Sequence, residues 1–183
     1  MNLLNAIQER RSVRSFNKET VPNETIERLL ELALYAPNHK MTQPWRFVVL
    51  NREDQVEFFH FIQANKARKK GEEEPERKPL AEDAPSHIIA IVMNVNENDK
   101  LHRDDFAATG SLVQNFSLLA WEEEIGVVWK TPGLIHEPEF HEFLGVNEGE
   151  EVIGLLWIGY PEVVPEIKPR ETLKVQYGLP SKS

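Results

Sequence analysis

Three arginines and two serines lie within residues 9–16, ERRSVRSF, of a chain whose formal net charge is -9. Arg10, Ser12 and Arg14 alternate along this stretch, so in an extended chain their side chains point the same way. Guanidinium groups bind phosphate through paired hydrogen bonds, and a serine hydroxyl adds a further donor. The spacing therefore indicates a clamp for an anion. A solvated helix end is the other interpretation, since cations also favour the C-terminal end of a helix dipole.

A second basic pair lies near the other end of the chain, in IKPRET at residues 167–172. Lys168 and Arg170 alternate in the same way, so they too can face one point. Taken alone, such a pair is typical of solvated surface.

The segment APNHKMTQPWRF, residues 36–47, is predicted to be a loop between a helix and a strand. Pro37 and Pro44 fix φ at their own positions and limit the freedom of the loop. Loops in such positions often carry the groups that contact ligands. The donors and acceptors available here are Asn38, His39, Thr42 and Gln43.

Hydrophobic spacing predicts the elements that must position these segments, and their irregular alternation favours an α+β layer structure. Helices are expected from Leu3 to about Arg10, over 21–37, through Phe58, Phe59 and Ile62, over 103–124 and over 138–145. Strands are expected at 46–50, 87–95, 126–130 and 152–161. The helix side chains expected inside are Ile26, Leu29, Leu30, Ala33, Leu34, Phe106, Leu112, Val113, Phe116, Leu119 and Ala120.

The 183 residues fit a single domain, 1–183. Residues 65–85 are rich in charge and contain Gly71 and two internal prolines, so we predict a solvated loop or mobile excursion with room for some helix. From about Val163 the chain carries no clear element and is expected to be an extended tail.

Composition and missing motifs exclude several classes of function. The chain has no cysteine, which removes disulfides, thiolate metal sites and thiol nucleophiles. Its acidic balance argues against nucleic-acid binding, and no apolar run is long enough for a membrane span, so a cytoplasmic protein is expected. No phosphate-loop or G-x-G-x-x-G motif occurs. His136 and His141 are five apart, unlike the helical zinc motif, so no metal is expected.

In combination, RRSVRSF, APNHKMTQPWRFVVL, LVQNFSLLAWEEEIGVVW and the late KPR resemble the nitroreductase family of FMN-dependent oxidoreductases. Their order and spacing cover nearly the whole chain. The resemblance implies a nitroreductase-like α+β fold, with a central mixed, mainly antiparallel sheet flanked by helices. It also implies an intertwined homodimer with the flavin site at its interface, in which the extended tail wraps the partner.

The resemblance further implies which residues hold FMN. The two basic clusters would converge on its phosphate, and the 36–47 loop would reach the flavin from the partner subunit. The segment WKTPG would pass the isoalloxazine ring, with Lys130 tuning the flavin, although Pro132 lacks a backbone N–H. The complete set is Arg10, Arg11, Ser12, Arg14, Pro37, Asn38, His39, Met41, Gln43, Trp129, Lys130, Thr131, Pro132, Gly133, Lys168 and Arg170.

The implied activity passes hydride from NAD(P)H through FMN to nitroaromatic or quinone acceptors in a ping-pong scheme. Because the flavin carries that chemistry, no protein nucleophile is required. A protein that binds or senses FMN without turnover remains the alternative.

Overall fold

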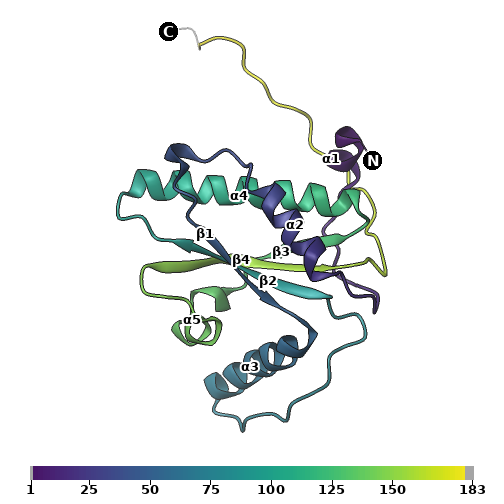
Figure 1. The fold of residues 1–183 in the computed structure, drawn as a ribbon, viewed down its shortest axis with the longest axis vertical. Helices are drawn as coiled ribbons and strands as arrows, with labels where there is room; N and C mark the ends of the chain where they lie inside the picture. Colours follow the sequence, from purple (N-terminus) through teal and green to yellow (C-terminus); the bar gives the residue numbers. More distant parts are fainter. Residues whose placement is uncertain (1, 180–183) are drawn as a thin grey trace.

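A computed structural model describes residues 2–179, and it places one four-stranded sheet between two layers of helices (Figure 1). The strands are β1 (Trp45–Leu50), β2 (His87–Asn94), β3 (Gly126–Lys130) and β4 (Glu150–Gly159). They lie in the order β1-β2-β4-β3, and every neighbouring pair is antiparallel. The prediction of an α+β fold with a mainly antiparallel sheet is confirmed. A parallel bridge between Ser12 and Val127 adds the N-terminal segment to the edge of β3.

The helices divide between the two faces of the sheet (Figure 1). On one face lie α2 (Asn23–Ala33) and α4 (Asp99–Glu122), and on the other α3 (Arg52–Lys70) and α5 (Pro138–Leu144). Each face of the sheet packs against its helices in a hydrophobic cluster, and β2 contributes to both because its side chains alternate between the faces. Ile89 and Ile91 belong to the cluster with α2 and α4, and Ile88 and Ala90 to the cluster with α3 and α5. The short α1 (Leu3–Glu9) lies against α4. None of the helices within residues 2–179 is long and apolar enough to cross a bilayer.

Caps set the ends of α3, which had no predicted bounds, and the start of α4, which precedes the predicted one. α3 starts behind a capping box made by Asn51 and Asp54, and it ends at Gly71, whose φ of 70° suits glycine. The helix therefore continues into the segment expected as an excursion. α4 starts at Asp99 because the Asn98 side chain accepts hydrogen bonds from the next turn.

Two side chains expected on the inner faces of α4 and α2 are exposed, so those predictions are wrong. Phe106 is 50% exposed, because the inward stripe of α4 passes through its neighbour Asp105 and then Thr109. Leu34 is 36% exposed, because α2 ends at Ala33 and Leu34 already caps it.

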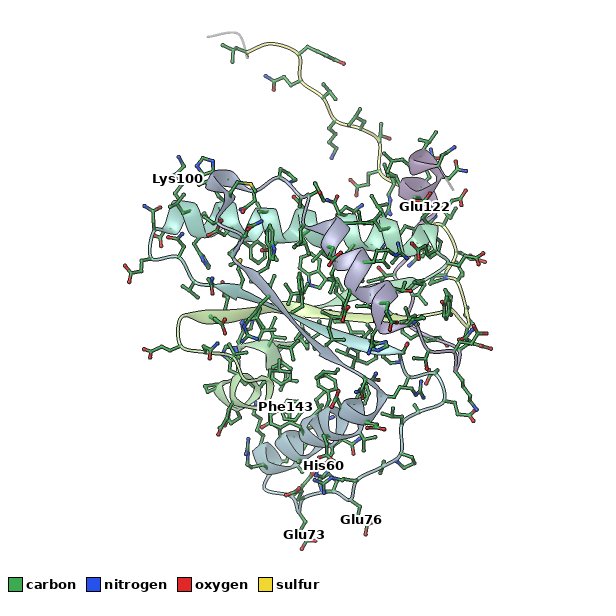
Figure 2. All side chains as sticks on the ribbon, in the orientation of Figure 1. His60, Glu73, Glu76, Lys100, Glu122 and Phe143 are labelled. Atoms are coloured by element: carbon green, nitrogen blue, oxygen red, sulfur yellow. The ribbon has the colours of Figure 1, made fainter. Side chains whose placement is uncertain are left out.

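After α3 the chain returns alongside the same helix. Glu74 contacts Nε2 of the buried His60 at 2.9 Å, and Arg77 pairs with Glu57 at 3.0 Å. Glu73 and Glu76 point outward from this segment (Figure 2). The charged stretch is thus attached to α3 by ion pairs rather than by a core of its own.

The N-terminal arm, residues 10–17, packs beside β3 through a close backbone approach. The Val13 N–H donates to the Val127 carbonyl at 3.2 Å, and the Val13 side chain is fully buried. A Cβ at Gly126 would lie 2.7–2.9 Å from the Val13 side-chain carbons. Only glycine therefore leaves room for the arm at this point.

We expect Gly126→Ala to destabilise the fold by about 1–3 kcal/mol, because Val13 and the arm must move to admit the methyl group. Gly110→Ala in α4 is the matched control, since no atom outside its own helical turn lies within 4 Å of the added Cβ. That control is expected to stabilise the helix by about 0.5–1 kcal/mol. Urea unfolding of both variants checks this, and equal unfolding midpoints would contradict it.

Candidate functional site

The two basic clusters of the sequence line one pocket of about 370 Å³, here called the basic pocket. Arg10, Arg11, Ser12 and Arg14 come from the N-terminal arm, and Lys168 and Arg170 come from the tail, residues 160–179. The remaining lining residues are Pro165 and Glu166. Five cations therefore face one carboxylate, although the chain as a whole carries a net charge of -9.

The backbone explains how the arm presents its side chains. α1 ends at Glu9, and Arg10 is already extended, with φ -52° and ψ 132°. Beyond it, Val13 points into the core while its neighbours Ser12 and Arg14 are exposed. The last turn of α1 itself contains no cation, but Arg10 caps the helix and Arg11 donates to the Gln8 carbonyl, so the helix end accounts for part of this positive charge.

Hydrogen bonds between the arm and the start of the tail hold the two clusters together. The Asn17 N–H donates to the Tyr160 carbonyl at 2.9 Å, and the Glu162 N–H donates to the Ser15 carbonyl at 3.0 Å. A bridge between Phe16 and Pro161 lies between these bonds. The tail therefore leaves β4 along the arm, which brings Lys168 and Arg170 to the arm's arginines.

The electrostatics of the basic pocket favour a bound anion. Burial lowers the pKa of Arg10, and the charges of Arg11 and Arg170 lower it further. Arg11 is only 9% exposed; its Nη1 donates to the carbonyls of Gln8 and Arg10. Its buried Nε and Nη2 have no hydrogen-bond partner within residues 2–179. An unpaired buried guanidinium N–H is costly, and an anion supplies the missing acceptor and the missing charge.

A second, larger hollow of about 670 Å³ lies between α3 and the sheet, and is here called the apolar groove. Lys130 and Pro132, from the segment WKTPG, line it together with Trp157 of β4. The Lys130 ammonium lies 3.0 Å from the centre of the Trp157 ring. Burial, and then the charge of Arg14, lower the pKa of Lys130. Lys130 therefore lines the groove, and the charge of Arg14, which lines the basic pocket, reaches it.

The other residues of WKTPG, residues 129–133, lie next to Lys130 and Pro132 in the chain. Trp129 is partly exposed, and its Nε1 lies where a side chain at Gly154 would begin. Thr131 and Gly133 are exposed on either side of Pro132, where the chain enters the 3-10 helix η2 (Gly133–His136).

The 36–47 loop is not brought to the basic pocket within one chain. It lies beside the first half of α4, where the Thr42 hydroxyl donates to the buried Asp105 carboxylate at 2.5 Å. Asn38 accepts from the Gln43 N–H at 2.7 Å. Lys40, Met41 and Gln43 all have positive φ. None of the loop residues expected at the flavin lines the basic pocket within residues 2–179. These residues are Pro37, Asn38, His39, Met41 and Gln43.

Sequence reasoning missed the side chains that hold this loop and the groove. Asp105 lies on the inward stripe of α4, four residues before Thr109, and that spacing is a signal of its burial. No pattern in the sequence indicates which α3 side chains line the groove, because this depends on how α3 packs against β4.

A comparison with protein families matches residues 7–160 to the nitroreductase family. The chain belongs to this family. Among curated relatives, the Bacillus subtilis protein named "Putative NAD(P)H nitroreductase YfhC" is 36% identical over 180 residues, covering 96% of this chain and 92% of that protein.

Solved structures agree with the nitroreductase assignment. A nitroreductase-like family protein from Bacillus cereus superposes with a TM-score of 0.82 at 30% identity, covering 97% of each chain. The FMN complex of a Desulfovibrio desulfuricans protein superposes with a TM-score of 0.74, covering 97% of this chain and 99% of that one. At 21% sequence identity, this superposition shows that the two proteins share a fold.

We expect millimolar inorganic phosphate to raise the melting temperature of the ligand-free protein, because an anion relieves the repulsion in the basic pocket. Arg10→Gln/Arg170→Gln should abolish most of this increase, whereas Lys18→Gln/Lys100→Gln, with the same change in charge, should retain it. Sodium chloride at equal ionic strength is the reference. An equal response of both double variants would contradict an anion site here.

Proposed function

We propose that this nitroreductase-family chain is an FMN-dependent oxidoreductase that passes hydride from NAD(P)H to nitroaromatic or quinone acceptors. The observation that carries the proposal is the basic pocket, which is lined by cations from both ends of the chain, among them Arg11 with its unpaired N–H groups. A terminal phosphate is dianionic near neutral pH and offers three acceptor oxygens, which suits this donor set. The FMN bound by a protein of the same fold supports the choice of ligand.

In this proposal the arm and the tail hold the phosphate end of FMN. Arg10, Arg14 and Arg170 supply charge, while Ser12 and Lys168 supply further donors. The parallel bridge between Ser12 and Val127 runs the arm along β3, so a ring that leaves the basic pocket along this strand would pass the segment WKTPG at its end. Since Pro132 has no N–H, a backbone donor to the ring must come from Thr131 or Gly133.

FMN held by Arg10, Arg14, Lys168 and Arg170 would supply the hydride chemistry that links a reduced nicotinamide to an acceptor in a ping-pong scheme. The chain's own residues anchor the phosphate, place a cation beside the ring and limit access of water. The reductant follows from the NAD(P)H in the name of the Bacillus subtilis relative.

We further propose that two copies of the chain form the working unit. The apolar side chains Leu3, Leu4 and Ile7 of α1 are exposed within one chain, as are Ile167, Leu173 and Tyr177 of the tail. The tail leads away from the body of the chain (Figure 1). Exposed apolar surface of this kind is typical of an interface. A partner would cover it and bring its 36–47 loop to the flavin.

The purified protein should be yellow, hold one FMN per chain, sediment as a dimer and be bleached by NAD(P)H. Arg10→Gln/Arg170→Gln should lose most of its FMN while keeping its circular dichroism spectrum, because the phosphate contacts anchor the cofactor. The Lys18→Gln/Lys100→Gln control should retain FMN. A colourless protein, or FMN held by a monomer, would contradict the proposal. Bleaching without electron transfer to any nitro compound or quinone would leave an FMN-binding or sensing protein.

Lys130→Met should lower the reduction potential of the bound FMN, because it removes the cation nearest the proposed ring position. Lys130→Arg keeps the charge and should leave the potential close to that of the unaltered protein. Equilibrium titration against a dye of known potential checks both variants. An identical potential in Lys130→Met and the unaltered protein would remove this role of Lys130.

A further inference from the structure

The apolar groove has the size and the walls of a small-molecule site. Its volume of about 670 Å³ lies within the range of about 300–1,000 Å³ that such sites occupy. Phe59 and Ile62 of α3 line it together with Leu155 and Trp157 of β4. The rings of Phe59 and Trp157 meet edge to face, 5.6 Å apart at 86°. Walls of this kind favour a planar aromatic molecule.

Cations surround this apolar lining. Lys66, Lys69 and Lys70 line the groove from the end of α3, and Lys130 lines it from the end of β3. One carboxylate, Glu137, lines it too, and it is engaged by Lys69 at 2.5 Å and by the Asn65 amide at 2.6 Å. Within residues 2–179 no carboxylate lies within ion-pair distance of Lys66, and Lys70 has only a distant contact with Glu72 at 3.7 Å. The groove therefore has an excess of positive charge.

Stabilisation of the helix end does not account for this arrangement. Cations in the last turn of α3 would favour its dipole whichever way they pointed. Arg68, in the same turn, points elsewhere: it donates to Asn65 and lies 3.5 Å from Glu139. Lys66 precedes the last turn, and Lys130 belongs to another element. The shared feature of the four lysines is the groove that they line.

We propose that this groove binds the electron acceptor, and that the acceptor is an aromatic molecule carrying a carboxylate or sulfonate group. The ring would lie against the apolar lining beside the Phe59–Trp157 pair, with its anionic group at Lys66 and Lys70. This inference rests on the proposed function, because Lys130 and Pro132 line both the groove and the path assigned to the flavin ring. A molecule in the groove therefore lies next to that ring.

For a nitro acceptor the step is a two-electron reduction. The nitro group takes up hydride, which originates from NAD(P)H, and one proton from solvent. One nitrogen–oxygen bond breaks, water leaves and a nitroso group remains, while NAD(P)H becomes NAD(P)+. The anionic group takes no part in this change and serves only to hold the molecule.

A pair of acceptors that differ in charge tests the proposal on the FMN-loaded protein. We expect a higher kcat/KM for 4-nitrobenzoate than for 4-nitrobenzamide. Lys66→Gln/Lys70→Gln should reduce this preference about tenfold, as expected for the loss of two charge contacts. Lys18→Gln/Lys100→Gln makes the same change in charge away from the groove, and Lys100 lies on the opposite side of the sheet from α3 (Figure 2). It should keep the preference. Equal preference in the two double variants would overturn the proposal.

A binding measurement separates this inference from the proposed activity. Titration calorimetry of the oxidised holoenzyme with 2-naphthoate, which cannot be reduced, should show binding that weakens about tenfold in Lys66→Gln/Lys70→Gln. Binding of 2-naphthamide should not weaken in that variant. If both ligands bind alike, or neither binds, the groove is not an acceptor site even where NAD(P)H bleaches the flavin. If 2-naphthoate binds as expected but no acceptor is reduced, the groove is a site for aromatic acids and the proposed activity is wrong.

Discussion

Repulsion between guanidinium groups is the constraint around which the rest of this chain is arranged. Burial lowers the pKa of Arg10, and the charges of the nearby Arg11 and Arg170 lower it further. Burial of Arg11 adds to the cost, because water no longer satisfies its Nε and Nη2. A counter-charge stabilises such a cluster, and Glu166 is the one carboxylate within residues 2–179 that lines the pocket. This excess of positive charge is what supports the proposal that the basic pocket binds an anion.

The fold supplies the two backbones that hold these charges together. The arm lies along β3 because Gly126 admits Val13, and the first residues of the tail bond to the arm at Asn17 and Ser15. Both contacts lie at the β3 edge of the sheet, where Val127 belongs to the first hydrophobic cluster and Tyr160 packs against it. The sheet and its helices thus provide a rigid edge, and the site is built on chain segments attached to it.

Much of this arrangement could be predicted from the sequence where the signal is local. Strands such as 87–95 are continuous apolar runs, and the alternation around Ser12 is a property of neighbouring residues. The burial of Phe106 was mispredicted because helix phase depends here on a single polar residue, Asp105. The ends of α3 had no predicted position, because capping depends on Asn51 and Gly71. The groove could not be predicted at all. Its walls come from α3 and β4, which are far apart in sequence and meet only through packing of the second cluster.

The tail has a consequence for the lifetime of any complex formed at the basic pocket. Lys168 and Arg170 belong to a segment without helix or strand, attached to the body near Tyr160 and Pro161. Two of the five cations can therefore leave together with their backbone, while the three arginines of the arm stay in place. Departure of the anion is then gated by detachment of one chain end, so its residence time reflects the dynamics of that end as well as the strength of individual contacts.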